Sequence, residues 1–271
     1  MDLGPTLIAE LLALGVVAGF LAGLLGVGGG MMMVPVLTLL LTQRGVPAGP
    51  AVKMAIATSM ATIMLTSLSS VLAHHRRGHV RWDIARAMAP GIVLGSLGAG
   101  AGAFAVVKGQ TLALVFAAFI GYMALQMLRG SQPRASRQMP GFAGQTAVGA
   151  AIGFVSALVG AGGAFLSVPF MTWCNVPPRQ AVGSSAALGF PIALASTVGY
   201  VISGWSLPAA LPGALGYLYL PAWLVVSVAS MSLAPLGAQA AQRLNVATLR
   251  RLFAVLLLAL AASMLARGLG G

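Results

Sequence analysis

The sequence contains very little charge, and this shortage excludes most classes of protein. Only 7% of the 271 residues are charged, whereas 59% are hydrophobic. A soluble domain has about 25% charged residues, so this chain cannot cover a water-facing surface. It also lacks the long polar tracts that stay disordered. Its apolar runs are too long for the alternating strands of a membrane barrel, so the composition predicts an all-α polytopic membrane protein.

Acidic residues and cysteines are especially scarce. The acids Asp2, Glu10 and Asp83 stand against fifteen Lys and Arg. Glu10 is the one acid within an apolar stretch. Carriers of cations or protons usually need buried acids, so the sequence favours an anionic or a neutral substrate. The single cysteine, Cys174, excludes an internal disulfide.

The formal charge of +12 has two interpretations. A basic soluble chain can bind nucleic acid, but here the basic residues cluster between apolar runs, as the positive-inside rule predicts. We therefore expect a lipid bilayer and no nucleic acid as partner. Residues 74–81, 129–137 and 243–251 are expected in the cytoplasm. The uncharged residues 204–219 are expected outside, together with both termini.

Neither a metal site nor a catalytic site is expected. His74, His75 and His79 lie in one basic loop, without a cysteine or an acidic ligand set. Intramembrane hydrolysis needs a nucleophile with a base in reach, and these histidines are far from the other motifs in the sequence. We therefore predict no cofactor and no enzymatic activity.

Ten apolar segments are expected to form helices. They are residues 7–25, 31–41, 51–73, 84–107, 112–129, 142–159, 165–174, 182–203, 220–239 and 246–267. Most reach the ~20 residues that cross a bilayer core. Residues 31–41 and 165–174 are shorter and, at ~1.5 Å per residue, cover only about half to two thirds of that thickness. Both short segments directly follow a glycine cluster.

The glycine clusters belong to an internal repeat. Gly26 to Pro35 aligns with Gly160 to Pro169, 134 positions further on, with both prolines in register. Other, weaker matches between the two halves occur at similar offsets. This predicts a first repeat over residues 1–130, a linker over 131–141 and a second repeat over 142–271. Because five segments is an odd number, the second repeat would be inverted, as is typical of secondary transporters with sites at broken helices.

These motifs resemble the sulfite exporter TauE/SafE family of permeases over nearly the whole chain. The resemblance rests on the paired G-x-G-G-x₅-P elements, Thr58-Ser59, the basic loop His75-Arg76-Arg77-Gly78 and the turn Pro235-Leu236-Gly237-Ala238. It implies a carrier in the bacterial inner membrane that moves small sulfur-containing anions, such as sulfite or organosulfonates, often outward. The two halves differ in one place, because Gly183-Ser184-Ser185 stands where the first half has Lys53-Met54-Ala55.

The glycine breaks suggest how an anion would be bound. A break frees backbone N–H groups at the start of the next short helix, where the helix dipole is positive. The alternative is that the glycines only allow close helix packing. Hydroxyl groups nearby are suitable donors, although in membrane helices they often bond to their own backbone. The predicted substrate-binding residues are Gly28, Gly29, Gly162 and Gly163 for backbone donors and Thr58, Ser59, Ser184 and Ser185 for hydroxyl donors.

Two charged residues add further hypotheses. Lys53 begins a long helix, where it either snorkels to the outer interface or attracts the substrate anion. Glu10 either couples transport to protons or simply ends an outer helix. The sequence thus predicts a secondary transporter of small anions that works by alternating access. The alternatives are a non-transporting membrane subunit or scaffold and a carrier of a neutral solute.

Overall fold

The structure is a computed structural model that describes residues 4–25, 29–130, 136–206, 212–240 and 246–269. The first half contains α1 (Pro5–Leu25), α2 (Gly30–Gln43), α3 (Ala48–Arg76), α4 (Trp82–Leu97), the π-helix η1 (Gly98–Ala103), α5 (Phe104–Val106) and α6 (Gly109–Arg129). The second half contains α7 (Phe142–Val159), α8 (Ala164–Trp173), α9 (Pro178–Gly204), β1 (Ala214–Leu215), β2 (Leu218–Tyr219), α10 (Leu220–Ala240) and α11 (Val246–Leu269).

The all-α membrane architecture is confirmed. Each of the ten predicted segments is helical, with ends within a few residues of those expected. Eight of the described helices are long and apolar enough to cross a membrane, while α2 and α8 are shorter. This agreement follows from the bilayer, which requires every spanning segment to be apolar and internally hydrogen-bonded.

Two local features were not predicted. The fourth segment changes into a π-helix at residues 98–103, a run of alternating glycine and alanine, before the single turn of α5. The uncharged loop contains a two-stranded antiparallel hairpin, in which Ala214 pairs with Tyr219 and Leu215 with Leu218. Gly216 turns the chain there with a positive φ of 57°. Strands of two residues are too short to give a periodic signal.

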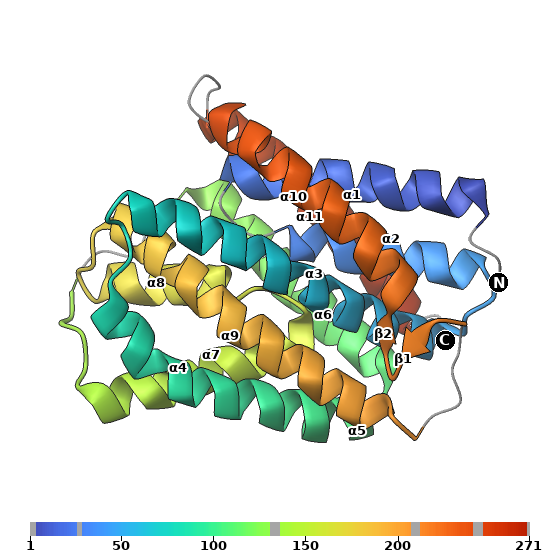
Figure 1. Ribbon diagram of the computed structural model, residues 1–271, viewed down its shortest axis with the longest axis horizontal. Coiled ribbons are helices and arrows are strands. Elements are labelled where there is room, and N and C mark those ends of the chain that lie inside the picture. The colour runs from blue at the N-terminus through green and yellow to red at the C-terminus, as the bar shows by residue number, and fades with distance from the viewer. Residues whose placement is uncertain (1–3, 26–28, 131–135, 207–211, 241–245, 270–271) are drawn as a thin grey trace.

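Four helix pairs build the bundle. α1 packs on α10, α4 on α7, α3 on α9, and α6 on α11, so that each pair joins one helix from residues 1–130 to one from residues 142–271. Both termini and the β-hairpin lie at one end of the molecule, which we call the hairpin end (Figure 1). The turn between α3 and α4 lies at the opposite end, which we call the basic end (Figure 1).

Glycines set the close approach of two of these pairs. A Cβ added to Gly19 of α1 would lie 2.4 Å from the carbonyl oxygen of Ser230 in α10. A Cβ added to Gly153 of α7 would lie 2.5 Å from the carbonyl oxygen of Ile92 in α4. The backbones approach this closely because the glycine at each contact has no side chain, and small residues of this kind are common where membrane helices associate.

Candidate functional site

The two glycine clusters meet in the interior of the bundle. Gly29 precedes α2 and Gly163 precedes α8, and both have left-handed backbones with φ of 44° and 74°. Other residues rarely adopt this conformation without strain. A Cβ added to Gly30 would lie 2.9 Å from the carbonyl oxygen of Gly160. From this meeting point, α2 occupies the half of the molecule near the hairpin end and α8 the half near the basic end (Figure 1).

The starts of the two short helices have different surroundings. The start of α8, at Gly162 and Ala164, lines a cavity of about 360 Å³. The start of α2 borders a space of only about 10 Å³, closed by apolar side chains that include Phe165 of α8. The first N–H groups of a helix have no acceptor within it. Near the start of α8, Gly163 and Leu166 already donate their N–H groups to the carbonyl oxygens of Ala161 and Gly163. The backbone left at the cavity wall is that of Gly162 and Ala164, whereas the start of α2 is covered by apolar side chains.

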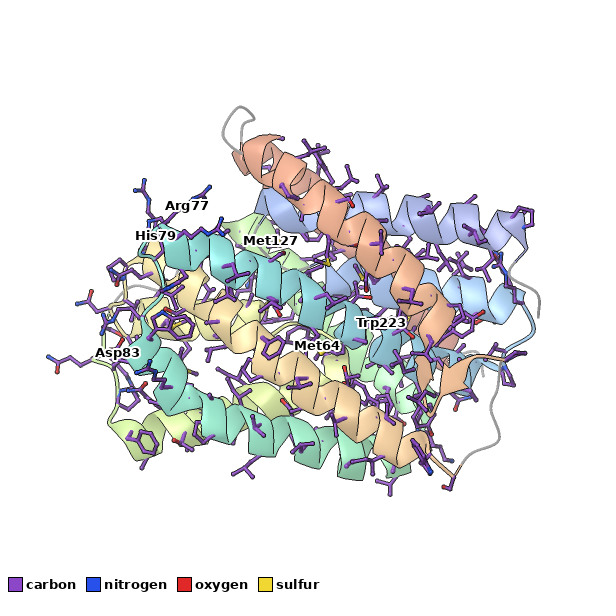
Figure 2. The ribbon with its side chains drawn as sticks, viewed as in Figure 1. Met64, Arg77, His79, Asp83, Met127 and Trp223 are labelled. Carbon is purple, nitrogen blue, oxygen red and sulfur yellow. The ribbon has the colours of Figure 1, made fainter. Side chains whose placement is uncertain are left out.

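The cavity extends from the start of α8 to the basic end. Along α3 and at the residue that follows it, the cavity is lined by Thr66, Ser67, Ser69, Ser70, His74 and Arg77. Side chains of α1, α9 and α10 complete the wall. Figure 2 shows Arg77 together with His79 and Asp83 at the basic end. A water molecule occupies about 30 Å³ of liquid, so the cavity has room for a small hydrated anion.

Most hydroxyl groups of α3 in the cavity donate to their own helix. Thr66 donates to the carbonyl oxygen of Ile63 at 3.3 Å, Ser67 to that of Met64 at 3.1 Å and Ser69 to that of Thr66 at 2.9 Å. Such bonds use the hydroxyl hydrogen. These three side chains therefore present only acceptor lone pairs to the cavity. The sequence analysis missed them, because a serine-rich stretch inside a long apolar run reads as part of a spanning helix.

The four hydroxyl residues predicted from the sequence lie in four different places. Ser185 lines the cavity. Ser59 donates to the carbonyl oxygen of Gly30 at 3.3 Å and so connects α3 to the start of α2. Thr58 accepts the backbone N–H of Tyr219 at 3.2 Å, in the hairpin. Ser184 accepts the backbone N–H of Arg81 at 2.9 Å, at the basic end. The structure therefore brings Ser185, but not the other three, to the cavity.

Ser167 is a further buried hydroxyl residue beside the cavity. Its Oγ lies 2.9 Å from the carbonyl oxygen of Gly163 and 2.8 Å from the Oγ of Ser185. Ser167 thereby ties the start of α8 to the hydroxyl group of Ser185 that faces the cavity. The sequence signal was available, because Ser167 lies inside the second glycine motif, where the first motif has Met33.

The predicted glycines divide in a similar way. Gly162 lines the cavity. Gly29 and Gly163 make close contacts instead: an added Cβ would lie 3.0 Å from the carbonyl oxygen of Ala18 and 2.3 Å from the Cδ1 of Ile192, respectively. Gly28 lies outside the described residues. The glycine clusters therefore serve close packing at Gly29 and Gly163 and place backbone at the cavity wall at Gly162.

Lys53 and Glu10 lie away from the cavity wall. The side chain of Lys53 is buried, and its Nζ donates to the carbonyl oxygen of Ala105 at 3.3 Å and to the phenol oxygen of Tyr217 at 3.4 Å. It therefore points into the protein rather than snorkelling to the interface. Glu10 pairs with Arg44 at 2.5 Å and is 43% exposed.

The charge on the cavity wall is positive. Among its lining residues, Arg77 is the one that carries a full charge at pH 7. The two acids that the structure describes are paired elsewhere, Glu10 with Arg44 and Asp83 with Arg81. A cavity with low-dielectric walls and charge of one sign concentrates ions of the opposite sign. The arrangement therefore suits an anion.

Fold and site together define a class of protein, a polytopic helical membrane protein whose bundle contains a cavity lined by several hydroxyl residues and one arginine. Residues 11–264 match the sequence profile of the family described as sulfite exporter TauE/SafE. The chain belongs to this family and is a membrane transporter. The resemblance seen in its motifs is thus confirmed.

Similarity to relatives named as probable membrane transporters extends along nearly the whole chain. A probable membrane transporter protein of Haemophilus influenzae is 35% identical over 262 residues, which are 96% of this chain and 98% of the relative. A probable membrane transporter protein of Methanocaldococcus jannaschii is 26% identical over 253 residues, 90% of each chain. No solved structure matches this chain.

Proposed function

We propose that this transporter carries small anions, and that sulfite or small organosulfonates are its substrates. The observation that carries the proposal is the cavity that joins the start of α8 to Arg77 at the basic end. A small oxyanion there would meet backbone N–H groups, the positive end of a helix dipole and the hydroxyl group of Ser185. The family resemblance supports sulfur as the central atom.

Alternating access is the proposed mechanism. The cavity reaches the basic end, whereas Tyr217, Leu218 and Tyr219 are buried at the hairpin end. We take this as the state that is open on the basic side. In the opposite state the start of α2 would lose its apolar cover and become the exposed end. We assign no catalytic step to any residue.

An inverted repeat would give the chain two such states. The repeat offset relates α1 to α7 and α4 to α10. If the halves are related in this way, the contact of α1 with α10 should have a counterpart between α7 and α4. Both pairs do pack together. The close-packed Gly19 and Gly153 are 134 positions apart, the same offset as the glycine clusters. These observations support residues 1–130 and 142–271 as inverted repeats joined by residues 131–141.

The proposed orientation follows from charge. Residues 74–81 at the basic end carry three arginines, which the positive-inside rule assigns to the cytoplasm. Both termini lie at the other end (Figure 1). We therefore place the protein in the bacterial inner membrane with its cavity open to the cytoplasm and both termini outside.

Flux into proteoliposomes tests the function. Purified protein is reconstituted, and movement of sulfite, methanesulfonate, sulfate and chloride is measured with and without a pH gradient. We expect selective movement of one sulfur anion, and a lower rate for Ser185→Ala. Movement that depends on the gradient would make Glu10 the first residue to replace as a proton-coupling group. No anion flux through folded protein would contradict the proposal and favour a neutral solute or a scaffold.

A further inference from the structure

The β-hairpin forms the closed end of the molecule. Tyr217, Leu218 and Tyr219 are at most 9% exposed. The backbone N–H of Tyr219 donates to Thr58 of α3. The hairpin turn also presses on α9, because a Cβ added to Gly204 would lie 2.8 Å from the backbone of Gly216. The hairpin is therefore held between α3 and α9, the helix pair at the centre of the bundle.

Lys53 lies beneath this hairpin without an acidic partner. Its Nζ is 5.1 Å from the centre of the Tyr217 ring and 5.5 Å from that of Phe104. Its hydrogen bonds go to neutral oxygens, the phenol of Tyr217 and the carbonyl of Ala105. Neither of the two acids described by the structure contacts it. Aromatic faces attract cations, so the two rings and the two neutral oxygens take the place of a counter-ion around this buried ammonium group.

The aromatic rings are themselves fixed by packing. Phe104 is fully buried, and its ring centre lies 4.4 Å from that of Tyr200 and 5.5 Å from that of Tyr217. The π-helix at residues 98–103 directly precedes Phe104. Such interruptions of a helix often occur at functional positions. The ring cluster therefore joins the end of the fourth spanning segment, α9 and the hairpin around a single ammonium group.

The basic end carries a similar contact without the charge. There the α3–α4 turn lies on the first turns of α9: Ser184 accepts the N–H of Arg81, and a Cβ added to Gly183 would lie 2.4 Å from the carbonyl oxygen of His79. In the repeat alignment Gly183 takes the place of Lys53. A buried cation is thus specific to the hairpin end.

We propose that the hairpin is a gate and that Lys53 is both its latch and an anion site. With the gate closed, the ammonium group lies against Tyr217 and Phe104. When the hairpin lifts, the ammonium group leaves the rings and binds a small oxyanion at the hairpin end. Anion binding to Lys53 thereby stabilises the open gate. The anion's identity rests on the proposed function, whereas the latch does not.

Cysteine labelling tests the latch without measuring transport. In a Cys174→Ser background, the reporter is Leu218→Cys, and the matched control is Leu215→Cys on the paired strand. Leu218 is 6% exposed, whereas its partner Leu215 is 39% exposed. A membrane-impermeant maleimide should label the control quickly and the reporter slowly. Adding Lys53→Met should raise the reporter's rate about thirtyfold, the loss expected for a desolvated cation–π contact, and leave the control unchanged.

Two further variants separate the latch from misfolding. Tyr217→Leu removes the ring and should also raise the reporter's labelling, whereas Tyr217→Phe keeps the ring and should have a smaller effect. All variants must remain monodisperse in detergent. If the labelling rate of the reporter were unchanged in both Lys53→Met and Tyr217→Leu, the latch would be refuted.

An anion arm tests the binding site. Methanesulfonate is the probe, because sulfite itself adds to maleimides. It should raise labelling of the reporter when Lys53 is present and have no effect in Lys53→Met. If labelling of the reporter rose in both substitutions but did not respond to methanesulfonate, Lys53 would not be an anion site. The latch itself would still stand. Flux of the anion, measured separately, decides the proposed function.

Discussion

Gly30→Ala is the sharpest test of the meeting point of the two glycine clusters. The new methyl group would lie 2.6 Å from the Cδ1 of Ile63 and 2.9 Å from the carbonyl oxygen of Gly160. The Ile63 side chain can rotate away. The carbonyl group is backbone and must move by about 0.5 Å to reach an ordinary contact distance. Overpacking of this kind costs about 1–3 kcal/mol, from which the better helix propensity of alanine subtracts at most ~1 kcal/mol.

The expected net loss is therefore about 1–2 kcal/mol. For a chain of this size it corresponds to a fall of about 2–8 °C in the unfolding temperature. Thermal unfolding of the purified protein in detergent measures it. The matched control is Gly49→Ala, a glycine in the first turn of α3 whose added Cβ meets nothing within 4 Å, and which should be neutral or slightly stabilising. If Gly30→Ala were as stable as this control, the two clusters would not touch as described.

Three further predictions concern the cavity and the thiol. Ser167→Ala removes the hydroxyl group that bonds Ser185. Since one hydrogen bond is worth about 1 kcal/mol, we expect KM for the anion in a flux assay to rise about fivefold in Ser167→Ala. Ser167→Thr keeps the hydroxyl group and should restore KM. An unchanged KM in Ser167→Ala would exclude a role for Ser167 in positioning Ser185. Arg77→Gln should raise KM at low salt, and the difference should shrink as ionic strength increases. The neighbouring Arg76→Gln, outside the cavity lining, is the control and should not show this. Burial raises the pKa of the Cys174 thiol, which keeps the thiol protonated at pH 7. Maleimide labelling of Cys174 should therefore be slow in folded protein and increase only as pH rises above the ordinary thiol range. Equal labelling rates in folded and SDS-denatured protein would contradict this prediction.

Much of the fold was predictable because the constraints of a bilayer are local. Each spanning helix must be long and apolar wherever it packs, so the segment ends could be placed within a few residues. The glycine clusters were recognisable in the same way. Gly29 and Gly163 need backbone conformations that other residues resist, and the short segments after them are too short to cross.

The site was predictable only in part. Gly162 and Ser185 do line the cavity, but Thr58 and Ser184 accept hydrogen bonds from loops at opposite ends of the molecule. In the sequence, Thr58 is next to Ser59 and Ser184 is next to Ser185. Adjacent residues on a helix point about 100° apart, so neighbours such as Thr58 and Ser59 face different elements.

The sequence by itself determined the class of protein, its helices, its glycine breaks and its family. Tertiary structure alone decided that the start of α8 opens to a cavity while the start of α2 is sealed by Phe165. It also decided that Lys53 lies beneath a hairpin about 160 positions further along the chain. Hydropathy is a property of each segment, whereas a cavity and a buried contact depend on how helices distant in sequence rotate and cross.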